Sequence, residues 1–249
     1  MLYNGVFSAI LYAAETWGDI TTVSEKILQM ERQALKRCLG IKSSTPNNLL
    51  YIELNRADLV ATIKDRQHKF FRKLFELEEG SAVVLDVLEL CKELAIVKYY
   101  EELHDDHRNR NLTERKSICA STSGTYSRRY AELTNLNYCP ALYESFMRED
   151  LRIIITRWRM SCFDLAIETG RYEGKPREER LCLFCDVIED EQHAIFTCKA
   201  YHHIRENYEN ILKDNPSVER ILNPKSEEIA IQVGMFLKQI EAERNSLLK

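Results

Sequence analysis

The chain has 249 residues, of which 45% are hydrophobic and 30% charged, as in a soluble folded protein with one large or two small domains. Its 8 glycines and 5 prolines are too few for the many turns of an all-β fold, so a mainly helical fold is expected. The formal net charge of −4 excludes a global positive field, so any contact with nucleic acid must use a local basic face.

The N-terminal apolar run, residues 6–14, has the character of a signal-peptide core but lacks its flanks. No Lys or Arg precedes it, and Glu15 and Trp17 follow where a cleavage site would lie. The run is also too short to span a membrane. We therefore expect a nuclear or cytoplasmic protein that is not secreted. Its eight cysteines should then be thiols or metal ligands rather than disulfides.

Start and stop signals predict a helical domain over residues 1–108. Thr22 and Glu25 form a capping box before an apolar-periodic run, and Gly40 stands where that helix should stop. Further helices in this part are predicted to begin at Thr45-Pro46, at Asp58 and at Ser81.

Residues 109–127 are polar, rich in Ser and Thr, and without periodicity. They are interpreted as a flexible linker before a second helical domain, 128–249. In that domain a long helix is predicted after Pro140, and two further helices are predicted over 201–212 and 227–247.

The motif with the most specific chemistry is Cys182-x2-Cys185, seven residues, His193, four residues, Cys198. Two cysteines in a tight turn can place both thiolates on one ion, and a His and a Cys at the ends of a short helical segment can complete a tetrahedron. Zinc prefers this ligand set, and four protein ligands leave no open position, so the site is predicted to be structural. Three thiolates and Zn²⁺ sum to a charge of about −1, which Arg180 and Lys199 are expected to offset.

Two alternatives stay open at this motif. The cysteines can be scattered small core residues, or His202 or His203 can replace Cys198 as the fourth ligand. The gap between the two ligand pairs is too short for the ββα finger that reads the DNA major groove, so a small CCHC knuckle is expected.

Two basic stretches are candidates for nucleic-acid contact. The predicted helix over 56–73 holds six Lys or Arg against two Asp, and the second stretch is Arg157-Trp158-Arg159, whose tryptophan is expected to be packed. For either stretch a solvated charged face is the alternative. The candidate phosphate contacts are Lys64, Arg66, Lys69, Arg72, Lys73, Arg157 and Arg159.

Several segments together resemble the C-terminal region of non-LTR (LINE-type) retrotransposon reverse transcriptases. Residues 11–18 (LYAAETWG) are similar to the segment after the palm of those enzymes. The thumb-like segments are 35–41 (LKRCLGI), 45–46 (TP) and 51–54 (YIEL). Those similar to the zinc-binding region are 167–172 (IETGRY), 180–185 (RLCLFC), 189–193 (EDEQH) and 198–205 (CKAYHHIR).

The resemblance implies a helical thumb-like bundle followed by a helical zinc-binding region, with zinc on the same four residues and RNA or DNA as partner. The paired aspartates of a polymerase palm and an endonuclease segment do not occur in this sequence. We therefore expect a noncatalytic, zinc-binding, nucleic-acid-binding fragment of a reverse transcriptase, with no small-molecule substrate and no membrane partner. The alternative is a structural or protein-interaction helical domain with a structural zinc and no role in nucleic-acid binding. A zinc hydrolase is disfavoured because it needs an open coordination position.

Overall fold

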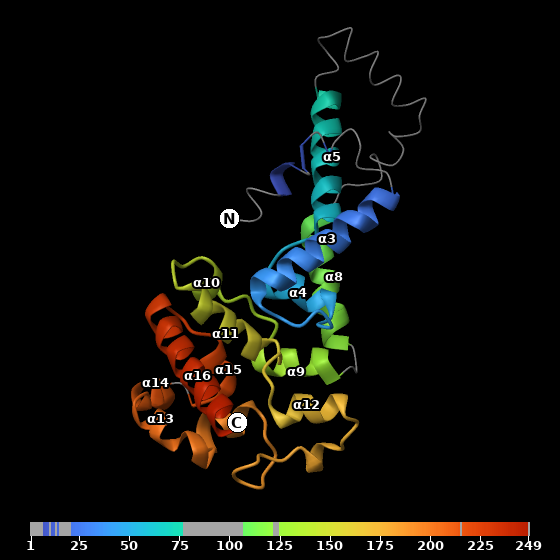
Figure 1. The fold of residues 1–249 in the computed structure, drawn as a ribbon. Helices are drawn as coiled ribbons and strands as arrows, with labels where there is room; N and C mark the ends of the chain where they lie inside the picture. The colour runs from blue at the N-terminus through green and yellow to red at the C-terminus, as the bar shows by residue number, and fades with distance from the viewer. Residues whose placement is uncertain are drawn as a thin grey trace. The chain divides into compact units, whose positions relative to one another are not determined.

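The computed structural model of the chain is mainly helical, which confirms the predicted fold class (Figure 1). It describes residues 7–9, 11–12, 14, 21–76, 107–121, 125–214 and 216–248. No strand occurs in these ranges, where an isolated antiparallel bridge pairs Leu181 with Ile188. The helix predicted from Ser81 onward lies outside the described residues up to position 106. None of the described helices is long and apolar enough to cross a membrane.

The helices follow one another along the chain with short connections. In the first half they are α3 (Thr21–Leu39), α4 (Asn47–Glu53), α5 (Leu59–Glu76), α8 (His107–Ser121) and α9 (Thr125–Thr134). Then come α10 (Pro140–Tyr143), α11 (Glu149–Arg159), α12 (Ala166–Tyr172) and the short turns η1 (Arg177–Glu179), η2 (His193–Thr197) and η3 (Lys199–Tyr201). The last are α13 (His202–Glu206), α14 (Glu209–Asp214), α15 (Val218–Leu222) and α16 (Glu227–Leu247).

The chain forms two compact units that differ from the predicted domains. The first unit is residues 1–33 with 56–115, and the second is 34–55 with 116–249. Residues 34–55 join the C-terminal half because they pack closely there. Gly40 has a φ of 64°, as its predicted place at a helix stop requires, and a Cβ on it would lie 2.5 Å from Cγ2 of Ile153.

The segment predicted to be a flexible linker, 109–127, is instead helical over most of its length, as α8 and the start of α9. Within the first unit, Asn111 and Arg115 stand one turn apart on α8 and both donate to Oδ2 of Asp58, at 3.2 and 2.5 Å. Oδ1 of Asp58 accepts from the backbone N–H of Ala61 at 2.8 Å and so caps α5. Because polar contacts fix this part of α8, the helix has no apolar periodicity to detect.

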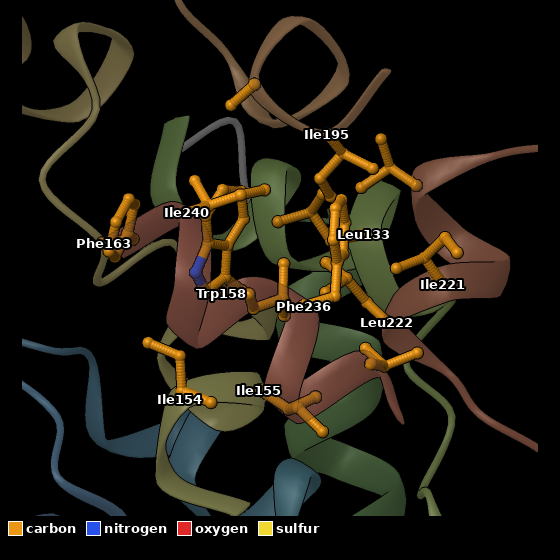
Figure 2. Packing of buried hydrophobic residues seen from close by; sticks show 14 of the residues in the cluster. Leu133, Ile154, Ile155, Trp158, Phe163, Ile195, Ile221, Leu222, Phe236 and Ile240 are labelled. Carbon is orange, nitrogen blue, oxygen red and sulfur yellow. The ribbon is translucent and has the colours of Figure 1, made fainter. Parts of the chain in front are cut away.

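The core of the second unit is built on α11 and α16, which pack side by side (Figure 1). Trp158 is fully buried and stacks on Phe163, with ring centroids 4.5 Å apart. Figure 2 shows Phe236 and Ile240 of α16 in the same cluster, together with Ile195 from the metal-binding segment. The candidate metal centre is therefore attached to the main core of this unit.

Substituting Gly234, in the middle of α16, tests this packing. A Cβ on Gly234 would lie 2.8 Å from Cβ of Leu151 and 3.2 Å from its carbonyl oxygen. Gly→Ala in a helix normally gains about 1 kcal/mol, whereas overpacking against backbone costs about 1–3 kcal/mol. We expect Gly234→Ala to lower the free energy of unfolding by about 1 kcal/mol net in chemical denaturation. The neighbouring Met235→Ala, at a side chain 46% exposed, is the control, and an unchanged or raised stability of Gly234→Ala would contradict the close packing.

A buried ion pair fixes α4 against α11 in the second unit. Glu53 and Arg159 have fully buried side chains, and their two hydrogen bonds measure 2.6 and 3.0 Å. Glu53 also accepts hydrogen bonds from Tyr130 at 2.7 Å and from Tyr143 at 2.6 Å. Burial acts to lower the pKa of Arg159, but the adjacent carboxylate outweighs it and the pKa is raised, so the guanidinium stays charged.

Candidate metal centre

The first two ligands lie in a tight hairpin that the antiparallel bridge between Leu181 and Ile188 closes. The backbone N–H of Cys182 donates to the carbonyl of Val187 at 2.7 Å. The N–H groups of Cys185 and Asp186 both point back to the carbonyl of Cys182, at 3.4 and 3.2 Å. Asp186 takes a left-handed φ of 53° to make this turn. The predicted Cys-x2-Cys turn therefore forms.

The other two ligands lie at the start of η2 and directly after it. η2 is a single π-helical turn that begins at His193, and the N–H of Cys198 donates to the carbonyl of His193 at 2.8 Å. Thr197 supports the histidine ring, with its hydroxyl 3.0 Å from Nδ1. The structure thus brings the ligand atoms of Cys182, Cys185, His193 and Cys198 within 4.8 Å of one another.

The geometry of this group fits one tetrahedral metal ion. Sulfur atoms at 2.3 Å from a tetrahedral ion lie about 3.8 Å apart. Sγ of Cys198 is 3.8 Å from Sγ of Cys182 and 3.9 Å from Sγ of Cys185. Nε2 of His193 is buried and has no hydrogen-bond partner, which is costly unless the nitrogen binds something else. These four residues can hold a metal ion.

His202 and His203 stand outside the group. Their side chains are 72% and 61% exposed on α13. His202 faces Glu206 at 3.5 Å and His203 faces Glu243 at 4.0 Å. The structure therefore gives the fourth position to Cys198.

Burial sets the protonation of the ligands. It raises the pKa of the Cys182 thiol to about 12 and also raises the pKa of Cys198. It lowers the pKa of His193, so the imidazole is neutral, which is the form that binds a metal. A bound dication offsets the cost of ionising thiols in such a site.

The groups that compensate the sulfur charge differ from those predicted. Arg180 donates instead to the carbonyls of Lys175 and Ile167. Lys199 contributes its backbone N–H, 3.3 Å from Sγ of Cys185. The cation at the centre is Arg205, which donates to the carbonyl of Cys198 at 2.6 Å.

A buried pair ties the hairpin to the C-terminal helix. The carboxylate of Glu189 accepts hydrogen bonds from Arg244 of α16 and, at 2.7 Å, from the backbone N–H of Ala166. Sequence reasoning missed this pair because the two residues are 55 positions apart and no local pattern joins them.

Arg159 was predicted to contact nucleic acid, and this is wrong. Its side chain has no exposed surface and is held by Glu53, so it cannot reach a phosphate. Arg157 is 25% exposed and pairs with Glu241 at 2.7 Å. Trp158 between them is fully buried, as expected.

On α5, Arg66, Lys69, Arg72 and Lys73 are exposed. At 3.6 residues per turn they fall within an arc of about 120°; we call them the α5 stripe. Arg66 donates to the carbonyl of Leu11 at 2.9 Å, and Lys69 pairs with Asp65 at 2.8 Å. Lys64 is half-buried and lies off this arc. Phe70, expected in the core, is 39% exposed beside the stripe.

No family model, curated protein or solved structure matches this chain.

Proposed function

We propose that this chain is a noncatalytic, zinc-stabilised module that binds RNA or DNA, derived from the C-terminal region of a non-LTR reverse transcriptase. The observation that carries the nucleic-acid part is the α5 stripe, four exposed cations on one side of one helix. Side chains in such an arrangement can follow a phosphate backbone, and their binding energy comes largely from counterion release. The resemblance of the sequence to the thumb and zinc-binding region supports the same partner.

The metal in this proposal is zinc. Three sulfurs and one imidazole nitrogen at tetrahedral spacing form a set that zinc accepts without a preference from d-electrons. All four positions would be filled by protein atoms, so the ion holds the hairpin and η2 together and does not activate water.

Charge reversal in the α5 stripe tests the nucleic-acid part. We expect Lys69→Glu/Arg72→Glu/Lys73→Glu to weaken binding to a labelled RNA or DNA oligonucleotide at least about tenfold at low salt. The slope of log K against log salt should fall by about 2–3, since each lost phosphate contact contributes about 0.7–0.9. Fluorescence anisotropy over a salt series measures both quantities.

The matched control is Arg148→Glu/Lys213→Glu/Lys225→Glu, with the same change of charge at exposed positions of the second unit. An equal loss in this control would assign binding to net charge alone. No retention of any oligonucleotide by the unaltered protein at low salt would refute the proposal.

A protein-interaction domain is the second candidate, and one observation favours it. Leu181, Leu183 and Val187 on the metal-binding hairpin are 40%, 70% and 46% exposed. Apolar side chains grouped on one hairpin are typical of a contact surface. A partner that stays bound after nuclease treatment, and is lost in Leu183→Ser/Val187→Ser, would support this candidate over the first.

A further inference from the structure

A pocket of about 220 Å³ lies in the second unit between α9, α12 and the loop that leads to the metal-binding hairpin (Figure 1). Four of its lining residues are arginines, which come from two separate segments of the chain. The charged residues of the lining are Arg128, Arg129, Arg177, Arg180, Glu132 and Glu168.

The two inner arginines are fixed in place. Arg129 is 16% exposed and pairs with Glu191 and Glu132, while its Nε is buried without a hydrogen-bond partner. Arg180 donates to the carbonyls of Lys175 and Ile167. Carbonyls are neutral, and no carboxylate of the described ranges pairs with Arg180, so its positive charge is not cancelled by an ion pair.

The two outer arginines are available to a ligand. Arg128 is 62% exposed and lies 3.9 Å from Glu132, and Arg177 is 53% exposed and lies 3.5 Å from Asp190. Exposed pairs with such long separations contribute little, so both guanidinium groups can leave these carboxylates for a stronger acceptor at small cost.

The carboxylates of the lining do not reverse the sign of the pocket. Glu168 is buried and pairs with Arg171 at 2.8 Å, and Glu132 is shared between Arg128 and Arg129. With every carboxylate near the pocket matched to one arginine, the charge of Arg180 remains in excess. The pocket therefore favours an anion.

The size and donors of the pocket indicate which anion. Sites for whole small molecules measure about 300–1,000 Å³, so this pocket suits a single compact group rather than a whole nucleotide. Planar guanidinium groups match the oxygens of a phosphate in paired hydrogen bonds.

We propose that this pocket binds a phosphate group. The phosphate can belong to a polynucleotide backbone, a source that rests on the nucleic-acid binding proposed above, or to a free phosphate ester. Both sources present the same oxygens to the arginines, and the experiment separates them.

The experiment compares the zinc-loaded chain with Arg128→Glu/Arg177→Glu, which changes only exposed side chains. Inorganic phosphate is titrated by calorimetry, and a fluorescent single-stranded RNA by anisotropy. We expect the variant to raise the Kd for inorganic phosphate at least about tenfold, which equals about 1.4 kcal/mol. Arg148→Glu/Lys213→Glu carries the same change of charge outside the pocket and should leave that Kd within about threefold.

The outcomes assign the source or overturn the site. Weaker RNA binding by the pocket variant, with or without an effect on inorganic phosphate, assigns the pocket to a polynucleotide. A loss confined to inorganic phosphate, in a chain that binds no RNA, assigns it to a free phosphate ester and refutes only the nucleic-acid function. Unchanged affinities for both probes, or equal losses in the control, overturn the pocket as a phosphate site.

Discussion

Removing the bound metal is expected to unfold the segment that holds Cys182, Cys185, His193 and Cys198 and to lower the melting temperature of the chain. A metal that binds only the folded state stabilises it by about 4 kcal/mol when free metal exceeds Kd a thousandfold. The hairpin between Leu181 and Ile188 has one β-bridge to hold it, so most of its order must come from the ion. Circular dichroism with thermal melts, before and after chelation, measures the loss.

Single substitutions identify the ligands. We expect His193→Ala to reduce bound zinc from about one ion per chain to near none in elemental analysis, whereas His202→Ala and His203→Ala retain it. Among the cysteines, Cys198→Ser should lose the ion and the half-buried Cys38→Ser should keep it. Retention of zinc by His193→Ala with loss in His202→Ala or His203→Ala would show that another histidine completes the site.

Chelation also separates stability from binding. Because the α5 stripe belongs to the first unit and the metal ligands to the second, the stripe should keep its helical structure without metal. If all helical signal vanished on chelation, the metal would stabilise far more of the chain than its own hairpin.

The sequence predicted the metal ligands because their chemistry is local. All four lie within 17 residues, and cysteine and histidine at those spacings have few alternative uses. The helix after Gly40 and the stop at Gly40 itself were predictable for the same reason, since caps and turns are local signals.

Contacts between distant segments were not predictable from this one sequence. Arg159 has the same local pattern as an exposed basic residue, and only its encounter with Glu53, 106 positions away, buries it. In the same way α8 seemed a linker because polar Asn111 and Arg115, rather than an apolar stripe, hold it to Asp58. Local periodicity detects helices that pack through apolar faces and misses those that pack through charges.

Substituting Arg159 is expected to produce the second large effect. Arg159→Met removes the cation from a buried pair and leaves the carboxylate of Glu53 with only the hydroxyls of Tyr130 and Tyr143 as charged-state partners. Breaking a buried pair in this way costs about 3–5 kcal/mol in the free energy of unfolding. Urea denaturation of the full chain measures it. The control is Arg157→Met, whose partly exposed pair with Glu241 should contribute no more than about 1 kcal/mol.

A double-variant cycle distinguishes the ion pair from simple loss of packing. In Glu53→Met/Arg159→Met no buried charge is left alone, so the double variant should be more stable than the sum of the two single losses predicts by about 2 kcal/mol or more. Recovery stays incomplete because the hydroxyls of Tyr130 and Tyr143 lose their acceptor in the buried core. Additive losses would instead mean that Glu53 and Arg159 stabilise the unit independently, each through its other contacts. Arg159 has such contacts, since it donates to the carbonyls of Leu222 at 2.8 Å and of Asn137 at 2.9 Å, so the coupling energy alone isolates the pair.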